Sequence, residues 1–468
     1  MLPTSIVRNH FFGSARLPCS FYRGGTSKGL LFSTPTLAAF DNATRDRIIC
    51  RAMGSPDPDK RQIDGLGGGI SSLSKTAIVG PPDSALAERL SRLGTSFKDG
   101  IDYADDETLA SDAEKGWDLV YRFGQVPVQE GTQIDWTSTC GNLVSAVALF
   151  ALHQGHVQQE RIHRVFQELH HRPAEAGDCF GFRVRLLVAC SGQIVRAHVP
   201  VTLYTANNTT MWYPDLEGDH SISGVPGTAP GMLIETPLDS SSLLPTGNQI
   251  DTVSLENSSY PVTIINAGLP TIFIASHSLS STLDVDQLGT LSPSDLDSNV
   301  ALMTLLEKLR IGSAGLTAML QKTLSPSAPK ICIVHPTPVG GYTTTGGKHI
   351  GASEMHLLIR AVSVGNVHRT VPATCLSALA AGRAFPNSTI QHAVQAGAKW
   401  QREPSQDVVS IRVGQPAGVS EASVKVRPPT QSEQSNRLAR IPESIVYYRT
   451  ARRIIQGSID VPLSMISS

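Results

Sequence analysis

Two stretches of the chain are apolar on every face when they are read at helical spacing. Residues 140–152 read CGNLVSAVALFAL and residues 371–381 read VPATCLSALAA, and both are dense in small side chains. A helix that is apolar all round belongs in the interior of a domain. The pattern therefore predicts two buried helices, one in each half of the chain.

The remaining apolar positions form short or alternating runs, which are typical of strands. Helices are predicted at residues 41–53, with Asp41 as N-cap, and at residues 302–319. A polar helix facing solvent is predicted at residues 161–171, and the histidines on or beside it (His153, His156, His163, His170 and His171) are interpreted as solvated. The predicted strands are residues 15–21, 30–32, 119–128, 182–189, 194–204, 262–265, 271–274 and 331–334.

Gly and Pro recur at short intervals in residues 205–260, which predicts irregular chain and a domain boundary. We expect a first domain over residues 1–205, with its central helix near 140–154. A second domain is expected over residues 206–468, with its central helix near 372–384, and the C-terminal segment is a candidate for return to the first domain. The length of 468 residues is compatible with two or three domains.

The amino-acid composition limits the classes of protein to which the chain can belong. Hydrophobic residues make up 40% and charged residues 17%, so the chain can bury a core. With a formal net charge of -1, the chain lacks the excess of basic residues that nucleic-acid-binding proteins carry. No run approaches the roughly 18 apolar residues that a membrane-spanning helix needs. The first 40 residues contain no Asp or Glu, which weakly resembles a mitochondrial transit peptide, but we expect a short extension and a cytoplasmic protein.

The sequence offers no signal for a cofactor or a metal. The seven cysteines are irregularly spaced and form no CxxC, which argues against a disulfide framework and a structural zinc site. No HExxH, GxSxG or P-loop motif is present, and no GxGxxG follows a strand and opens a helix. We therefore expect chemistry without nucleotide, flavin or metal.

The first candidate segment is RGGTSKG, residues 23–29. Its glycines leave backbone N–H groups open to an anion, and its hydroxyls and cations add donors and charge. The alternative is a solvated hairpin turn. The candidate binding residues here are Arg23, Thr26, Ser27 and Lys28.

The second segment is DGLGGGISSLSK, residues 64–75. Consecutive glycines permit close approach of the backbone to a ligand, and we place Gly68, Ser71 and Ser72 in the binding set. Lys75 leads into the apolar run 77–79, where desolvation favours the neutral amine and makes it a usable base. The more common alternative is a lysine that extends to water.

The third segment is TCGN, residues 139–142, at the start of the first predicted buried helix. The first turn of a helix offers free N–H donors and a positive dipole end, which suit a carboxylate and favour ionisation of Cys140. Gly141 and Asn142 are the candidate binding residues. An inert buried cysteine is the alternative.

Two further segments are candidates for binding a carboxylate. Asn266 and Gly268 lie in NAGLPT between two predicted strands, where an ordinary β-turn is the alternative. His368 lies in a His-Arg pair shortly before the second predicted buried helix, where a surface pair is the alternative.

Taken together, the segments resemble the PrpF family of 2-methylaconitate cis-trans isomerases and their fungal relatives that isomerise cis-aconitate. The resemblance rests on an ordered set over nearly the whole chain: RGGTSKG, IDGLGGG, SKTAIV, CGNLVSAV, GVPGTAPG, LPTGN, NAGLPTIFI and RTARRI.

The resemblance implies an α+β fold of the diaminopimelate-epimerase type, in which each of two domains wraps a curved antiparallel sheet around one central helix. It also implies acid–base chemistry without a cofactor, with Lys75 and Cys140 as the proton-transfer groups. Cys375 falls slightly inside the second helix, unlike the helix-mouth cysteines of two-cysteine epimerases. A tricarboxylate substrate and a homodimer fit the resemblance.

These observations give one leading hypothesis and two alternatives. The leading hypothesis is isomerisation of an aconitate-type acid, with Lys75 removing a proton and Cys140 or a nearby water returning one; the two roles are interchangeable. The alternatives are an amino-acid racemase or epimerase on the same fold, which needs two catalytic cysteines, and a non-catalytic protein that binds organic acids.

Overall fold

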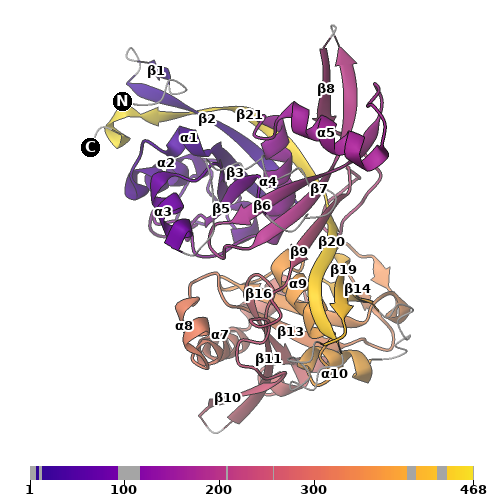
Figure 1. The fold of residues 1–468 in the computed structure, drawn as a ribbon. Coiled ribbons are helices and arrows are strands. Elements are labelled where there is room, and N and C mark those ends of the chain that lie inside the picture. The colour runs from indigo at the N-terminus through magenta and orange to yellow at the C-terminus, as the bar shows by residue number, and fades with distance from the viewer. Residues whose placement is uncertain are drawn as a thin grey trace. The chain divides into compact units, whose positions relative to one another are not determined.

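The computed structural model describes residues 7–9, 13–92, 116–206, 209–256, 258–397, 407–429 and 440–466. The chain divides into two compact units. Unit 1 contains residues 1–221, 227–234 and 448–468, and unit 2 contains residues 222–226 and 235–447. Strands β9 (Met232–Pro237) and β20 (Ile441–Arg449) carry the chain from one unit to the other (Figure 1).

Unit 1 encloses the first predicted buried helix, α4 (Gly141–His153), within strands of a mixed sheet (Figure 1). Eleven of the helix's residues are buried, so the all-apolar pattern is explained by burial on every face. The helix can approach the sheet closely because Gly24 and Gly29 lie beneath it. A Cβ at Gly24 would stand 2.7 Å from the carbonyl oxygen of Asn142.

The strands of unit 1 follow the order β21-β2-β3-β4-β5-β6-β7 along the sheet, with β8 and β9 both beside β7 and β1 beside β2. The pairings of β3 with β4 and of β5 with β6 are parallel. The strands are β1 (Val7–Asn9), β2 (Ser14–Gly24), β3 (Ser27–Ser33), β4 (Lys75–Gly80), β5 (Leu119–Gln125), β6 (Cys179–Val188), β7 (Ile194–Ala206), β8 (Thr209–Pro214) and β21 (Ala451–Pro462). The other helices are α1 (Thr34–Leu37), α2 (Asn42–Met53), α3 (Ser84–Arg92), α5 (Gln159–His170) and the 3-10 turns η1 (Ser71–Leu73) and η7 (Leu463–Met465).

Unit 2 is built around the second predicted buried helix, α9 (Ala373–Gly382), all of whose residues are buried. It packs against strands β11, β12, β18 and β19. The strands of this unit are β10 (Asp251–Leu255), β11 (Ser258–Asn266), β12 (Pro270–Ala275), β13 (Lys330–Pro336), β14 (Tyr342–Thr343), β15 (His349–Ile350), β16 (Leu357–Ser363), β17 (Asn366–Val367), β18 (Val408–Gln415) and β19 (Gly418–Arg427). The other helices are α6 (Pro293–Ser298), α7 (Val300–Ala314), α8 (Ala318–Lys322) and α10 (Thr389–Ala396).

The two units repeat one topology. In unit 1 the hairpin β2–β3 is followed by β4 parallel to β3, by β5 antiparallel to β4, by the central helix α4, and by β6 parallel to β5. Unit 2 has the same order of elements and the same strand directions: the hairpin β11–β12, strands β13 and β16, helix α9 and strand β18. The predicted α+β class with one central helix per half is confirmed, and the sheets contain parallel pairs in addition to antiparallel ones.

Several local predictions are confirmed and others need correction. Asp41 caps α2, and its carboxylate accepts a hydrogen bond from the Thr44 amide at 2.8 Å. The helix predicted over residues 302–319 is interrupted after Ala314, and a Thr317 N-cap starts α8. The region 205–260, predicted as irregular, contains strands β8, β9 and β10.

Three of the histidines interpreted as solvated, His153, His156 and His163, are half-buried. The Tyr22 hydroxyl lies 2.8 Å from Nδ1 of His153, and the Ser33 hydroxyl lies 3.0 Å from Nε2 of His156. Burial lowers the pKa of His153 to about 4, with the charge of Arg453 acting in the same direction. His153 and His156 therefore belong to the packing around the end of α4, because the sheet covers this end of the helix as well.

None of the helices in the described ranges is long and apolar enough to cross a membrane.

Candidate functional site

The N-terminus of α4 carries the candidate thiol. Cys140 is the N-cap residue of the helix, with extended backbone, and its side chain is half-buried. Its Sγ lies 3.8 Å from the hydroxyl of Ser27 on β3, and its carbonyl oxygen accepts a hydrogen bond from the hydroxyl of Tyr121 on β5 at 3.1 Å. Strand β3 thus contacts the thiol of Cys140, and strand β5 holds its backbone carbonyl.

Lys75 is the first residue of β4 and is only 8% exposed. Its Nζ donates to Oε1 of Gln125 at 2.7 Å and lies 5.1 Å from the ring centre of Phe123. Gln125 is the register partner of Lys75, and Phe123 lies two residues earlier on the same face of β5. The amine therefore contacts a polar and an aromatic neighbour in a largely buried position.

Lys75 and Cys140 face the same space above the sheet. Gly29 is the register partner of Lys75, and Ser27, which contacts Cys140, lies two residues before Gly29 on the same face of β3. With strands about 4.8 Å apart and a rise of about 3.3 Å per residue, the backbone positions of Lys75 and Ser27 are roughly 8 Å apart. The structure thus brings a lysine, a serine and a cysteine from three elements to one helix end.

Asn142, in the first turn of α4, ties the turn between β2 and β3 to the helix. Its Nδ2 donates to Oγ1 of Thr26 at 3.2 Å, and its Oδ1 accepts from Nε of Arg449 at 3.0 Å. Gly25 has φ +52, and a Cβ there would stand 2.7 Å from Asn142 Oδ1, which explains why this turn needs glycine. The amides of Gly141 and Asn142 find no backbone acceptor among the described residues.

Two predicted binding residues of the first segment lie away from the thiol. Arg23 and Lys28 are register partners, and strand alternation places them on the opposite face from Gly24 and Ser27. Nη1 of Arg23 donates to the carbonyl oxygens of Gly25 and Thr450 and to the Thr450 hydroxyl. The pKa of Arg23 is lowered by burial and by the charge of Arg452. The Arg23 guanidinium therefore secures the turn, and Lys28 points away from Cys140.

The glycine-rich second segment packs against its own chain. Oε1 of the buried Gln62 accepts from the Gly69 amide at 2.9 Å and from the Ser74 hydroxyl at 2.5 Å. A Cβ at Gly67 would stand 2.2 Å from that same oxygen, so the glycine is required by the fit of the loop around Gln62.

The loop leads directly to the candidate base. Gly68 is exposed, and Ser71 and Ser72 are half-buried in η1, immediately before Lys75. Nε2 of Gln125 donates to the Ser71 carbonyl at 3.1 Å and to the Ser74 carbonyl at 2.9 Å. Gln125 therefore joins the loop to the Lys75 amine.

The other predicted binding residues lie in unit 2. Asn266 ends β11, and Gly268, with φ +92, lies in the turn that leads to β12. The Asn266 amide donates to the Leu243 carbonyl at 2.9 Å. His368 is half-buried beyond β17, and its amide donates to the Ala361 carbonyl at 2.8 Å.

Several residues that hold the site together were not predicted from the sequence. Gln125, Tyr121 and Gln62 carry no local motif, and only the register of β4 with β5 brings Gln125 to Lys75. Arg449 had a signal, because it opens the RTARRI segment, yet its contact with Asn142 spans 307 positions of the chain.

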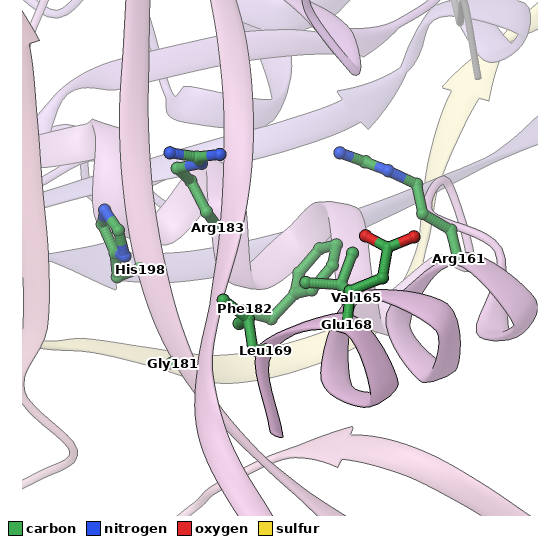
Figure 2. Close-up of a pocket in the computed structure, with 8 residues that line it drawn as sticks. All are labelled: Arg161, Val165, Glu168, Leu169, Gly181, Phe182, Arg183 and His198. Carbon is green, nitrogen blue, oxygen red and sulfur yellow. The ribbon is translucent and has the colours of Figure 1, made fainter. Parts of the chain in front are cut away.

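A separate cavity of about 240 Å³ lies in unit 1 between α5 and the strands β6 and β7. Its wall includes Phe182, Glu168, Arg183 and His198, which Figure 2 shows projecting from these elements. None of the predicted site residues lines it. Within the described residues, no cluster of three or more His, Cys, Asp and Glu side chains is arranged to hold a metal ion.

Comparison with known proteins places this chain in a family. The family described as PrpF protein matches residues 14–86 and 108–462. The 2-methyl-aconitate isomerase of Shewanella oneidensis is 30% identical over 96% of this chain and 97% of its own. The 3-methylitaconate isomerase of Eubacterium barkeri is 27% identical over 95% of this chain and 97% of its own. A crystal structure of methylitaconate-delta-isomerase is 25% identical, covers 97% of both chains and superposes with a TM-score of 0.61.

The chain therefore belongs to the PrpF protein family. This membership makes it an isomerase of the PrpF type and confirms the resemblance on which the fold was predicted.

Proposed function

We propose that this protein isomerises an aconitate-type tricarboxylic acid, without a cofactor, by removing a proton from carbon and returning one. The observation that supports the proposal is that Ser27 lies 3.8 Å from the Cys140 thiol at the N-terminus of α4, while Lys75 is the register partner of Gly29, two residues from Ser27 on the same strand. An amine and a thiol from different elements provide the base and the acid that such a reaction requires.

The proposed reaction begins at an allylic carbon that carries a carboxylate-activated hydrogen. The Lys75 amine, as base, takes that proton, and the electron pair left on carbon spreads over the double bond and a carboxylate. The Cys140 thiol then delivers a proton to a carbon of the allyl system, either at the far end or after rotation. The lysine ends as ammonium and the cysteine as thiolate, and a proton transfer through water then restores both groups. The reaction balances equally if the thiolate of Cys140 removes the proton and the ammonium of Lys75 returns one.

The charge that develops on the carboxylate needs donors that are already in place. The Gly141 and Asn142 amides lie at the N-terminus of the 13-residue helix α4, where unpaired N–H groups and the helix dipole favour an anion. Such fixed donors stabilise a developing negative charge without reorganisation during the reaction. Thr26, Ser27, Ser71 and Ser72 add hydroxyl donors to the proposed binding set.

The proposed substrate class follows from what the relatives share. The names of two relatives specify 2-methylaconitate and 3-methylitaconate, which are both unsaturated acids with an allylic hydrogen next to a carboxylate. Aconitate and its alkyl derivatives present the same groups. We therefore propose cis-aconitate or a 2-alkyl-aconitate as substrate and trans-aconitate or its alkyl counterpart as product.

The structure gives less support to a two-cysteine racemase. Cys375 is the third residue of α9 and is fully buried, whereas Cys140 is a half-exposed N-cap. A thiol without accessible surface is poorly placed to exchange a proton with an amino acid.

A substrate panel tests the proposal. Purified protein, treated with a chelator and dialysed, is incubated with cis-aconitate, with 2-methylaconitate and with a proline control, and products are separated by chromatography. We expect isomerisation of at least one aconitate and no change in proline. Racemised proline, or no turnover of either aconitate, would overturn the proposed function.

A further inference from the structure

The cavity between α5 and β6 has no part in the proposed reaction. Its volume is about 240 Å³, and all of its wall residues belong to unit 1. An apolar cavity of about 150 Å³ holds benzene, whereas drug-sized ligands occupy pockets of about 300 Å³ or more. The volume therefore suits a molecule with one ring or one branched chain and a small polar group.

One wall of the cavity is a single face of α5. Four side chains line it at the spacing of helical neighbours and project to the same side: Arg161, Val165, Glu168 and Leu169. Phe182 of β6 faces this helix, and the centre of its ring lies 5.3 Å from the guanidinium carbon of Arg161. Figure 2 shows the ring directed toward Val165. The cavity thus has an apolar surface between charged side chains.

The opposite wall is an edge of β6 that no described strand covers. β5 pairs with β6 only over residues 186–188, and at Arg185 the carboxylate of Asp118 accepts a hydrogen bond from the backbone amide at 2.7 Å. Because amides alternate between the two edges of a strand, the amide of Gly181, four residues earlier, points to the same edge. A Cβ at Gly181 would meet nothing among the described residues closer than the His198 Cβ, at 3.7 Å. Packing therefore does not require glycine here, and the missing side chain leaves the backbone open to the cavity.

Cationic side chains border this edge. Arg183 and His198 are register partners on β6 and β7, so they lie side by side on one face of the sheet, and both line the cavity. The charged wall residues Arg161 and Arg183 compare with a single carboxylate, that of Glu168. Arg161 also pairs with the buried Asp118, so Arg183 is the cation that we assign to a ligand. A guanidinium binds a carboxylate through charge-assisted hydrogen bonds.

We propose that this cavity is a second ligand site, which binds a small carboxylic acid with an apolar body of about the size of a substituted benzoate. Phe182 and Val165 contact the apolar body, and Arg183 and the Gly181 amide bind the carboxylate. A pocket with an apolar lining and a few convergent polar groups is the usual form of a small-molecule site. The site is separate from the proposed active site, and it does not depend on the proposed reaction.

Binding to the wild-type protein is measured by calorimetry with benzoate, 4-methylbenzoate and benzyl alcohol. Benzyl alcohol has the ring of benzoate without the charge. We expect both carboxylates to bind at millimolar concentration or below and benzyl alcohol to bind at least about tenfold more weakly, because it forms no charge-assisted hydrogen bond. Excess propane-1,2,3-tricarboxylate, a mimic of the proposed substrate, should not displace benzoate.

Two variants test the two walls. Val165→Trp fills the cavity and should weaken benzoate binding at least tenfold, whereas Gln167→Trp, which adds the same ring at an exposed position of α5, should change it less than twofold. Arg183→Gln should remove the preference for benzoate over benzyl alcohol.

A wild-type crystal soaked with 4-bromobenzoate locates the ligand even if a variant fails to fold, because bromine is identified by its anomalous scattering. Bromine between α5 and β6 would support the site. Bromine at other positions only, no binding of either carboxylate, displacement by the tricarboxylate, or wild-type affinity in folded Val165→Trp would overturn it. Equal affinity of the wild type for benzoate and benzyl alcohol would overturn the assignment of a carboxylate ligand.

Discussion

At the residue scale, the proposed reaction depends on two side chains whose surroundings differ. Lys75 is almost completely enclosed and contacts Gln125 and Phe123, whereas Cys140 keeps part of its surface exposed and contacts Ser27. The two groups therefore differ in how far they are exposed and in the neighbours that hold them.

Replacement of either group is the direct test at this scale. Cys140→Ser and Lys75→Ala should each lower kcat by about 10²–10⁴, because general acid–base groups contribute on that order. Turnover of the best aconitate is measured at saturating substrate, with Cys179→Ser as an exposed-thiol control. Near-wild-type kcat in both variants would refute the assignment.

Gln125 is expected to act through Lys75 as a positioning residue. Gln125→Leu removes the acceptor of the Lys75 Nζ and two backbone contacts to the preceding loop. We predict a fall in kcat of about tenfold or more, the effect of roughly 1.4 kcal/mol, with a smaller change in KM. The steady-state parameters are compared with those of Gln193→Leu, a half-exposed glutamine outside the site. An equal loss in both variants would show that the effect is not specific to Lys75.

At the element scale, the sequence predicts the helices whose position is determined by local burial and by a capping residue. Both central helices follow from all-round apolarity, and the α2 boundary follows from the Asp41 cap. The placement of Gln125 and Arg449 depends on strand register and on a return of the chain over hundreds of residues, which no local pattern encodes. Lys28 stays a predicted binding residue, and strand alternation along β3 places it on the face opposite Ser27.

The glycine-rich loop before β4 is the element most sensitive to a small change. In Gly67→Ala the new Cβ would stand 2.2 Å from Gln62 Oε1 and 2.6 Å from the backbone oxygen of Met53, so Gln62 and the loop before Lys75 must shift. We predict lower kcat and a lower Tm than in wild type. In Gly340→Ala, the control, the Cβ meets nothing within 4 Å and both quantities should stay near wild type. Wild-type activity in Gly67→Ala would mean that the loop does not position the site.

At the scale of the whole molecule, the chain presents one topology twice with different chemistry at equivalent points. The helix N-cap is Cys140 in unit 1 and Pro372 in unit 2, while the lysine at the start of the parallel strand is kept in both. The sequence indicated two similar halves, but the equivalence of Lys75 and Lys330 became visible only from strand register. The proposed proton transfer belongs to unit 1, whose central helix begins at the cysteine.

Acid should destabilise both units through half-buried histidines. Burial lowers the pKa of His153 in unit 1 and of His356 in unit 2 to about 4, from 6.5. Between these values the unfolded chain binds protons that the folded protein does not, so the free energy of unfolding falls as pH falls from about 6.5 to 4. Urea unfolding at pH 7.0, 6.0 and 5.0 should show this decline, and it should be smaller in His153→Gln. Constant stability over this range would contradict the buried, neutral state of these rings.

The central claim is that proton transfer to and from carbon moves the double bond. Proton NMR of the wild-type protein with cis-aconitate or 2-methylaconitate in deuterated buffer tests it most directly. The account predicts isomerised product with deuterium at an allylic carbon, and no deuterium in product or recovered substrate with Lys75→Ala. Isomerised product that retains all its original carbon-bound hydrogen under single-turnover and prolonged incubation would contradict exchange of the proton through Lys75 and Cys140.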